Sequence, residues 1–371
     1  MRFKVQTEPF RDALNKILSV VDKRNSRPIL TYTQIDVSEG KVEISATDLE
    51  VSSRIKVAAD VETAGTFCVN AKNISDILKG LPEGTVNFEI AEGENTLKIS
   101  CLDIHYTLLI YKSDDFPHLI FDNKENSFAL DSVQLLEIIG KTSHAISTDE
   151  TRLYLNGIYL QEFDSKLRAV ATDGHRLSML DTDLGENNIE TLMNGIIIPK
   201  KGVFEIKKVA ESFPDKKLNI SVDDSFIYIS ADDSYYLSIR LIAREYPKYQ
   251  AVIPSKTSFV MKTDKTIFHD AIRRIKIMSN EKSNGVKVSL KGNEMTVMAN
   301  HPSLGDARET LSVDYNGKEI EIGFNAKYLI DTLAAFDDGD ITLELNNELS
   351  PVVIKSQNLP NYLGIIMPLK L

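Results

Sequence analysis

The chain has 371 residues, of which 42% are hydrophobic and 26% are charged, and its net charge is −11. This composition is typical of a globular protein with two or three domains, and no apolar run approaches the roughly 18 residues of a membrane span. The first residues lack the apolar stretch of a signal peptide, and the two cysteines, Cys68 and Cys101, have no metal-ligand spacing. We therefore expect a cytosolic protein with two half-buried thiols.

The first third of the chain predicts short strands and two helices. Alternating apolar residues indicate strands, and apolar residues at a spacing of three or four indicate helices. The expected elements are a strand at 2–6, a helix at 8–22, strands at 31–38, 41–47 and 50–57, a helix at 71–80, and strands at 86–90, 97–100 and 105–111.

The same order of landmarks recurs twice more, at intervals of 125 to 131 residues. The landmarks are Phe3, Phe128 and Phe259 in the first strand, Ala46, Ala171 and Ala299 at the end of a later strand, and Lys72, Lys201 and Lys327 at the second helix. Pro-containing extended stretches near residues 117 and 247 suit linkers, so we expect domains at 1–122, 123–254 and 255–371. Each is expected to be an α+β domain with two helices on antiparallel sheets. Repeated units usually build a surface or a ring rather than one catalytic cleft.

Positive charge is concentrated in the six expected helices. Their windows carry a combined net charge of +5, so the rest of the chain carries −16. The acidic total, taken alone, argues against nucleic acid, because duplex binding depends on cations that meet phosphates. Two interpretations remain: lysine is simply a good helix former while acids collect in turns, or all six helices face one polyanion.

Helix packing limits the size of a ring that could surround such a polyanion. Helices pack about 8–10 Å apart, so six in a ring leave a hole of about 10 Å or less, whereas twelve leave about 20–28 Å. A DNA duplex is roughly 20 Å wide. One chain therefore cannot encircle it, but a closed head-to-tail dimer with six domains can.

The segment AVATDGHRLSML, residues 169–180, is the most distinctive local sequence. Asp173-Gly174 predicts a hairpin turn, and the first repeat has Leu-Glu-Val where this one has Gly174-His175-Arg176. The difference implies a role peculiar to the second repeat, either a partner contact or an acid–base or metal site at Asp173 and His175. The other five histidines form no ligand spacing with this one, and the chain has no phosphate loop, HExxH or GxSxG. We therefore expect no catalytic, cofactor or metal site.

Over its whole length the sequence resembles the beta subunits of bacterial DNA polymerase III, the sliding clamps. The resemblance is carried by RPIL at 27–30, RLYLNG at 152–157, ATDGHRL at 171–177, SNEK at 279–282 and IMPLKL at 366–371. It implies a non-enzymatic homodimer in the bacterial cytoplasm that slides on duplex DNA without sequence specificity and confers processivity. The replicative polymerase, the clamp loader, repair polymerases, ligase and mismatch-repair proteins are then the expected partners, with no membrane involved.

The resemblance also implies a groove between the second and third domains for the short apolar motifs of these partners. An apolar wall with a few polar fixing points is what a peptide pocket requires. The groove residues carried over by position are Leu155, Thr172, Gly174, His175, Arg176, Leu177, Pro247, Val252, Leu349, Pro351, Ile365, Met367, Pro368 and Leu371. The alternative for the apolar C-terminal tail is a last strand tucked into its own core.

Two further surfaces are expected, one for DNA and one for the second chain. The residues expected to face DNA are Arg24, Tyr154 and Lys200 by resemblance, and Lys201, Arg273 and Arg274 by charge. The residues expected at the dimer seam are Lys98, His105, Tyr106 and Leu108 of one chain and Ile277, Met278, Asp306 and Glu309 of the other.

This sequence departs from the family pattern on both surfaces. The family often has polar or basic residues at 148 and 149, where this chain has Thr148 and Asp149. Ser303, Leu304 and Gly305 stand where the seam is expected to carry charge, which favours apolar burial over ion pairs. Two other functions are compatible with the motifs: an adaptor that binds peptides but never encircles DNA, and an enzyme that uses Asp173 and His175.

Overall fold

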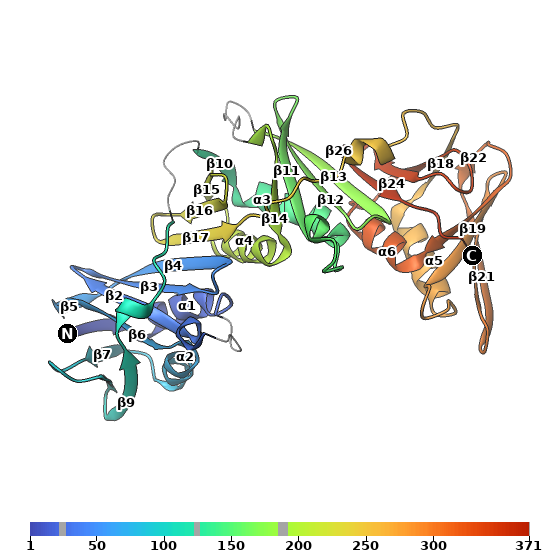
Figure 1. Cartoon of the computed structure of the whole chain (residues 1–371). Coiled ribbons are helices and arrows are strands. Elements are labelled where there is room, and N and C mark those ends of the chain that lie inside the picture. Colours follow the sequence, from blue (N-terminus) through green and yellow to red (C-terminus); the bar gives the residue numbers. More distant parts are fainter. Residues whose placement is uncertain (22–26, 122–126, 185–191, 371) are drawn as a thin grey trace. The chain divides into compact units, whose positions relative to one another are not determined.

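The computed structural model describes residues 1–21, 27–121, 127–184 and 192–370 (Figure 1). The chain falls into two compact units: unit 1 is Met1–Leu135 with Phe204–Leu241, and unit 2 is Leu136–Val203 with Ile242–Leu371. The described residues contain six α-helices, and their ladders are antiparallel throughout. The helices are α1 (Thr7–Ile17), α2 (Ala71–Gly80), α3 (Ser132–Thr142), α4 (Lys200–Ser212), α5 (Lys265–Lys276) and α6 (Ala326–Ala334).

Unit 1 is built on one 13-stranded sheet. Helix α1 lies against α2 and against strands β3 and β4 of this sheet. In spatial order the strands are β10 (Ser127–Asp131), β15 (Lys217–Val222), β16 (Phe226–Ala231), β17 (Tyr235–Arg240), β4 (Val51–Ala58), β3 (Lys41–Thr47), β2 (Tyr32–Ser38), β6 (Gly65–Asn70), β9 (Ile104–Tyr111), β8 (Thr96–Cys101), β7 (Thr85–Glu89), β1 (Arg2–Gln6) and β5 (Asp60–Thr63).

Unit 2 has a nine-stranded and a four-stranded sheet, and helices α5 and α6 contact strands of both. The larger sheet runs β14 (Ile196–Pro199), β11 (Gly157–Phe163), β12 (Lys166–Thr172), β13 (Arg176–Asp183), β26 (Leu359–Ile366), β25 (Val352–Ser356), β24 (Asp340–Leu345), β18 (Phe259–Asp264) and β22 (Asp314–Tyr315). The smaller sheet runs β21 (Gly305–Ser312), β20 (Glu294–His301), β19 (Gly285–Lys291) and β23 (Ile320–Asn325).

Local sequence explains where these elements begin and which faces they bury. Strand β2 alternates half-buried and buried residues, as its period-two pattern predicts. Helix α1 buries Phe10, Leu14 and Ile17, which share one face at helical spacing. The side chains of Asn70 and Asn325 accept hydrogen bonds from the first free N–H groups of α2 and α6, and so fix where these helices start.

One order of elements occurs three times along the chain: a strand, a helix, three strands, another strand, a second helix and three strands. Strands β4, β13 and β21 occupy the same place in this order, as do β9, β17 and β26. Strands β5 and β22 are additions to the first and third repeats. The threefold repeat expected from the sequence is thus confirmed, with two helices and antiparallel sheet in each copy.

Two of the repeated strand positions form the joints between repeats. Within unit 1, β4 pairs with β17, and Ser53 lies opposite Leu237. Within unit 2, β13 pairs with β26, and Ser178 lies opposite Gly364. Ser53 and Ser178 are 125 residues apart and pair with the landmark alanines Ala46 and Ala171, so the two joints use one register.

A few expectations differ from the structure. Helix α1 ends at Ile17 rather than near residue 22. The N–H of Leu18 still makes the helical bond to Leu14, but the N–H of Val20 bonds to the carbonyl of Ile17, only three residues back, in a tighter turn. Cys68 and Cys101 are fully buried free thiols rather than half-buried, and burial raises the pKa of Cys68 to about 12. Among the described residues no helix is both long and apolar enough to cross a membrane.

Candidate functional site

A cluster of apolar side chains lies on one face of the nine-stranded sheet of unit 2. It joins strands of the second repeat to strands of the third and to the extended segment between them. We call it the apolar cluster. Its buried members are Leu155, Val170, Leu177, Met179, Ile197, Tyr246, Tyr249, Val353 and Ile365, with Tyr154, Tyr159, Ile242, Ile253 and Leu363 partly buried against them.

Tyrosine rings make up much of this cluster. The rings of Tyr159 and Tyr246 are stacked with centroids 4.6 Å apart, and Tyr249 meets Tyr246 edge-on at 6.4 Å. Such pairs contribute about 0.5–1.5 kcal/mol beyond their buried area. The three rings therefore pack on one another within a cluster whose other buried members are aliphatic.

The structure brings together many of the residues expected at a peptide groove. Leu155, Leu177 and Ile365 are buried members of the apolar cluster. The expected residues that remain exposed are Gly174, His175, Pro247, Val252 and Leu349, whereas Pro351, Met367 and Pro368 are half-buried. Leu371 lies outside the described residues.

The C-terminal tail continues past the last strand without entering a core of its own. Strand β26 ends at Ile366, which is buried. The N–H of Met367 donates to the carbonyl of His175 at 2.8 Å, and the N–H of Leu369 donates to the carbonyl of Gly323 at 2.8 Å. The tail is thus held beside the 173–175 turn with its side chains partly open to solvent.

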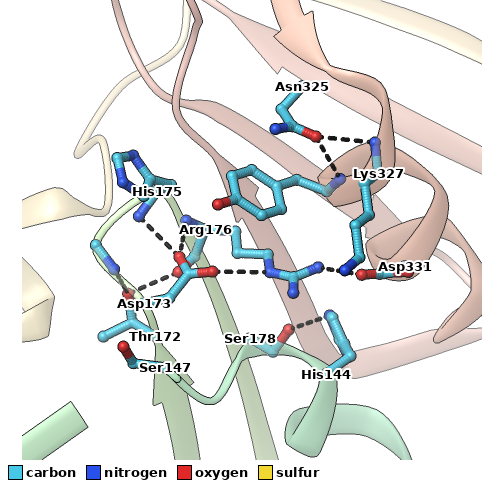
Figure 2. A network of polar contacts seen from close by, with 12 residues as sticks. His144, Ser147, Thr172, Asp173, His175, Arg176, Ser178, Asn325, Lys327 and Asp331 are labelled. Carbon is cyan, nitrogen blue, oxygen red and sulfur yellow. Dashed lines mark hydrogen bonds and ion pairs between the residues drawn. The ribbon is translucent and has the colours of Figure 1, made fainter. Parts of the chain in front are cut away.

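The polar groups of the turn at 173–175 form hydrogen bonds with one another. The N–H groups of His175 and Arg176 donate to Oδ1 of Asp173 at 2.9 and 3.0 Å, and Thr172 Oγ1 donates to the carbonyl of Arg176 (Figure 2). The His175 ring stacks on Tyr328 with centroids 5.9 Å apart. Asp173 and His175 therefore serve the turn and its packing, and they do not form an acid–base or metal pair.

Arg176 lies on the opposite face of the sheet from Leu177, because successive side chains of a strand alternate. Its Nε donates to Asp173 Oδ2 at 3.2 Å and its Nη1 donates to Asp331 Oδ2 of α6 at 2.7 Å (Figure 2). The guanidinium also lies 4.6 Å from the centroid of the Tyr328 ring. Of the residues expected in the groove, Arg176 is one that the structure does not place in the apolar cluster.

Ser178 continues this polar face toward α3 and the last strand. Its hydroxyl lies 3.0 Å from His144 Nε2 (Figure 2). The Tyr362 hydroxyl lies 3.2 Å from it on another side. Burial, and to a smaller extent the positive charge of Arg176, lower the pKa of His144 to about 4. The histidine is therefore neutral at physiological pH and serves as a hydrogen-bonding group.

The first repeat contains the same turn with different side chains. The N–H groups of Glu50 and Val51 donate to Asp48 as those of His175 and Arg176 donate to Asp173. Leu49 has a φ of 78°, close to the 89° of Gly174. Glycine at 174 is therefore not required by backbone conformation, although a Cβ there would lie 3.0 Å from Arg152 Nη1.

The residues expected to face DNA lie on separate elements. Lys200 and Lys201 begin α4, and exposed Arg273 lies 3.7 Å from Asp270 on α5. Tyr154 packs against the apolar cluster. Arg24 lies outside the described residues.

The loop before Tyr154 offers little free positive charge. Arg152 Nε donates to Asp149 Oδ2 at 2.8 Å, and hydrogen bonds from Thr151 and Arg152 lower the pKa of Asp149 to about 2. The carboxylate that replaces the family's polar or basic residue at 149 thus holds the arginine of this loop.

The residues expected at the seam lie on two strands with open edges and at the end of α5. In the described chain, β21 pairs only with β20, and β9 pairs with β8 and, through Ile110 and Tyr111, with β6. Lys98 lies 3.8 Å from Glu94 of its own chain. The expected residues that are exposed are Lys98, His105, Tyr106, Ile277 and Asp306, and those half-buried are Leu108, Met278 and Glu309.

Sequence reasoning missed several members of the apolar cluster. Val170 and Met179 lie on predicted strands at the alternation that includes Leu177, so the period-two pattern was a usable signal. Tyr246 marked a repeat boundary but not the site. Tyr249 and Val353 join the cluster through tertiary contacts that no local pattern shows.

These features together define a non-catalytic binding protein built from three like domains. Three family models match the chain: the N-terminal domain of the DNA polymerase III beta subunit over residues 1–120, the central domain over 129–248 and the C-terminal domain over 250–370. The chain therefore belongs to the DNA polymerase III beta-subunit family, the bacterial sliding clamps, which act as non-catalytic processivity factors of a polymerase holoenzyme.

Individual relatives match over the full length. The beta sliding clamp of Escherichia coli K12 is 30% identical, with all of both chains covered, and that of Rickettsia bellii is 31% identical, with 99% of this chain and 98% of the relative covered. Among solved structures, the sliding clamp of Bartonella birtlesii bound to griselimycin has a TM-score of 0.94 at 31% identity, with both chains fully covered. The beta subunit of Pseudomonas aeruginosa has a TM-score of 0.94 at 28% identity, with the same coverage.

Proposed function

We propose that two copies of this chain close head to tail into a six-domain ring around duplex DNA in the bacterial cytoplasm. The domains are 1–122, 123–254 and 255–371, close to the spans that the three family models match. The observation that carries the proposal is the pair of open strand edges, β9 and β21. These are the repeat positions that form the two joints within the chain.

The repeat supports one particular partner for each open edge. Joints form where β4 meets β17 and where β13 meets β26, so a strand of the β4 type always pairs with one of the β9 type. Within one chain this leaves β21 of the third repeat and β9 of the first without such a partner among the described residues. A second copy supplies both, and two seams close the ring.

The register of the two joints carries over to the seam. Ala307 pairs with Ala299 as Ser178 pairs with Ala171. By the same reasoning Tyr106, opposite Ile99 in its own sheet, corresponds to Gly364, opposite Ile354. The seam then places Tyr106 of one chain opposite Ala307 of the other, and Leu108 opposite Gly305.

Residue 277 supports the same seam. It occupies the repeat position of Ser19 and His144, which make hydrogen bonds beside the two joints, to Glu205 and to Ser178. Ile277 is instead apolar and 76% exposed. A large apolar side chain that is exposed at a position where the other two repeats carry polar, hydrogen-bonded residues fits a surface that a second chain covers.

The apolar cluster and its exposed rim are, in this proposal, the groove that receives partner peptides. The replicative polymerase, clamp loader, repair polymerases, ligase and mismatch-repair proteins would present short apolar motifs to it. We assign Tyr154 to this groove, because its ring packs against the cluster. Griselimycin, the ligand of two solved relatives, is proposed to bind here as well.

Duplex DNA is held topologically, with cations that meet phosphates and read no bases. Lys200, Lys201 and Arg273 are the described candidates, and such contacts depend on salt and not on sequence. Arg274 is less suited to this role because Glu309 neutralises it.

Retention on DNA tests the ring. The protein is loaded by a clamp loader onto nicked circular DNA, and half of the sample is then linearised. A ring slides off the ends of the linear DNA while it is still retained on the circular DNA. An adaptor that never encircles DNA shows equal retention on both. Sedimentation provides the second measurement: a mass of about twice 41.5 kDa supports the dimer, and a monomer excludes the ring.

A further inference from the structure

Strand β13 presents two different faces. Leu177 and Met179 point into the apolar cluster, where the proposed groove lies. Arg176 and Ser178 point to the other face, toward Asp331 and His144 (Figure 2). The Tyr362 hydroxyl also meets Ser178 there. A peptide on the groove face therefore meets the backbone of the 173–175 turn but not the Arg176 guanidinium.

The guanidinium connects this turn to a helix of the third repeat. It is 7% exposed and is held by Asp173 of the turn, by Asp331 of α6 and by the Tyr328 ring. Asp331 and Tyr328 belong to α6, which contacts β26 on the face opposite the apolar cluster: a Cβ at Gly364 would meet Thr332 of that helix. The contacts of Arg176 therefore span two repeats at the edge of the proposed groove.

The turn does not need an arginine in order to fold. The first repeat builds the same aspartate-capped turn with Val51 at the arginine position, and Val51 is fully buried. A buried guanidinium is costly unless it is paired, so valine is the simpler residue for this place. The presence of arginine at this position only in the second repeat indicates a role for Arg176 other than forming the turn.

We propose that Arg176 is a positioning residue for the groove. It ties the 173–175 turn to α6 through Asp331, and this contact sets the fraction of molecules whose groove is in the arrangement that binds peptide. This inference rests on the proposed groove function. The same turn also holds the C-terminal tail, because the carbonyl of His175 accepts a hydrogen bond from the N–H of Met367. Two parts of the groove rim thus share one anchor, which contacts no peptide.

A positioning role has a kinetic signature that a contact role lacks. If only a fraction of the chains has an aligned groove, the apparent dissociation constant rises by the inverse of that fraction. The loss of affinity then appears as a slower association rate, while the dissociation rate of the bound state is unchanged. Removal of a direct contact raises the dissociation rate instead.

The test compares griselimycin binding by wild type, Asp331→Asn and Asp331→Glu, with biolayer interferometry to separate the two rates. Asp331→Asn is expected to slow association by roughly 3- to 30-fold without a change in dissociation. Asp331→Glu keeps the carboxylate and restores most of the rate. The matched control is Asp338→Asn, which removes an acid whose partners are Lys265 and Thr266 at the start of α5 rather than the turn.

Tyr328→Leu is a second variant that removes the ring above the guanidinium but keeps an apolar side chain. It is expected to slow association in the same way, provided that its melting temperature shows a folded protein. If wild type binds griselimycin and both variants match Asp338→Asn, or if the loss is in dissociation, the positioning role is wrong. If wild type itself does not bind, the proposed groove fails, and the inference fails with it.

Discussion

Arg274 and Glu309 hold each other in a two-point ion pair, with Nε 2.9 Å from Oε2 and Nη2 2.5 Å from Oε1. The pair ties α5 to the open strand β21, and the hydrogen bond from Arg274 lowers the pKa of Glu309. The one residue was expected to face DNA and the other to pair across the seam. Since each is satisfied within its own chain, the proposed seam has one carboxylate fewer to pair with the second chain.

We therefore predict that dimerisation is nearly independent of salt. Raising NaCl from about 0.1 M to about 1 M shortens the Debye length from about 10 Å to about 3 Å and weakens exposed ion pairs. The dimer dissociation constant, measured by sedimentation, should change by less than about threefold across this range. A weakening of tenfold or more would show that ion pairs hold the seam.

Ile277→Ala should weaken the dimer strongly. Its side chain is 76% exposed in the single chain and is buried in the proposed dimer. Deletion of the methyl and methylene groups that the dimer buries costs about 2 kcal/mol at each of two seams. The dissociation constant should rise by about 10³-fold. The control is Ile267→Ala in the first turn of the same helix, which is 54% exposed and should leave the dimer unchanged.

His144 should make the fold sensitive to mild acid. Burial and Arg176 lower its pKa to about 4, while Asp331 and Asp173 partly oppose them. The unfolded chain takes up the proton near pH 6.5, so the contribution of the neutral histidine to stability is complete above that pH and is lost as the pH falls toward 4. The loss is at most about 3 kcal/mol.

Chemical denaturation at pH 7 and pH 4.5 measures this loss. His144→Gln keeps a group that can bond to Ser178 but does not titrate, so its free energy of unfolding should fall less than that of wild type. Equal losses in both proteins would place the acid sensitivity elsewhere.

Exchange of the two turn residues tests the role of Gly174. Leu49 shows that leucine can occupy this left-handed position, at a cost of about 1–2 kcal/mol. Gly174→Leu should therefore fold and dimerise but lose griselimycin binding by more than about tenfold, because the new side chain stands on the groove rim beside Arg152. The reciprocal Leu49→Gly is the control and should bind as wild type does. Undiminished binding by Gly174→Leu would remove this turn from the groove.

Deletion of Met367 to Leu371 should abolish stimulation of the polymerase and leave the dimer intact. The tail lies beside the 173–175 turn, whereas the proposed seam uses β9, β21 and the end of α5. Primer extension measures the first effect and sedimentation the second. A monomeric deletion variant would mean that the tail takes part in ring closure.

The repeat and its elements could be predicted from the sequence because their signals are local. Strand β1 begins and ends where the alternation of residues 2–6 places it, and α2 starts after Asn70 because a side-chain cap acts over three residues. The end of α1 was missed, since apolar spacing continues past Ile17 while the backbone already turns.

Some members of the apolar cluster were predictable from the sequence, but the face of the sheet on which each expected residue lies was not. Leu155, Leu177 and Ile365 meet in one cluster, as the resemblance implies. Arg176 and Leu177 are neighbours in sequence and were expected on the same surface, yet a strand sends them to opposite faces. The contacts of Arg176 with Asp331, 155 residues away, follow from tertiary pairing that no local pattern encodes.

Because the two open edges, β9 and β21, differ from each other, copies of this chain could assemble into an open-ended filament, and the shared register opposes this. A chain whose head fits the tail of the next copy adds subunits without limit, as an open filament, wherever the rotation between copies does not close. In the proposed ring, closure after six joints requires that each joint turn the chain by roughly 60°. A seam with the register of the two internal joints would repeat their angle. A single inserted residue in β21 would reverse its faces and break that equality. The shared register is therefore what would make a finite particle rather than a fibre.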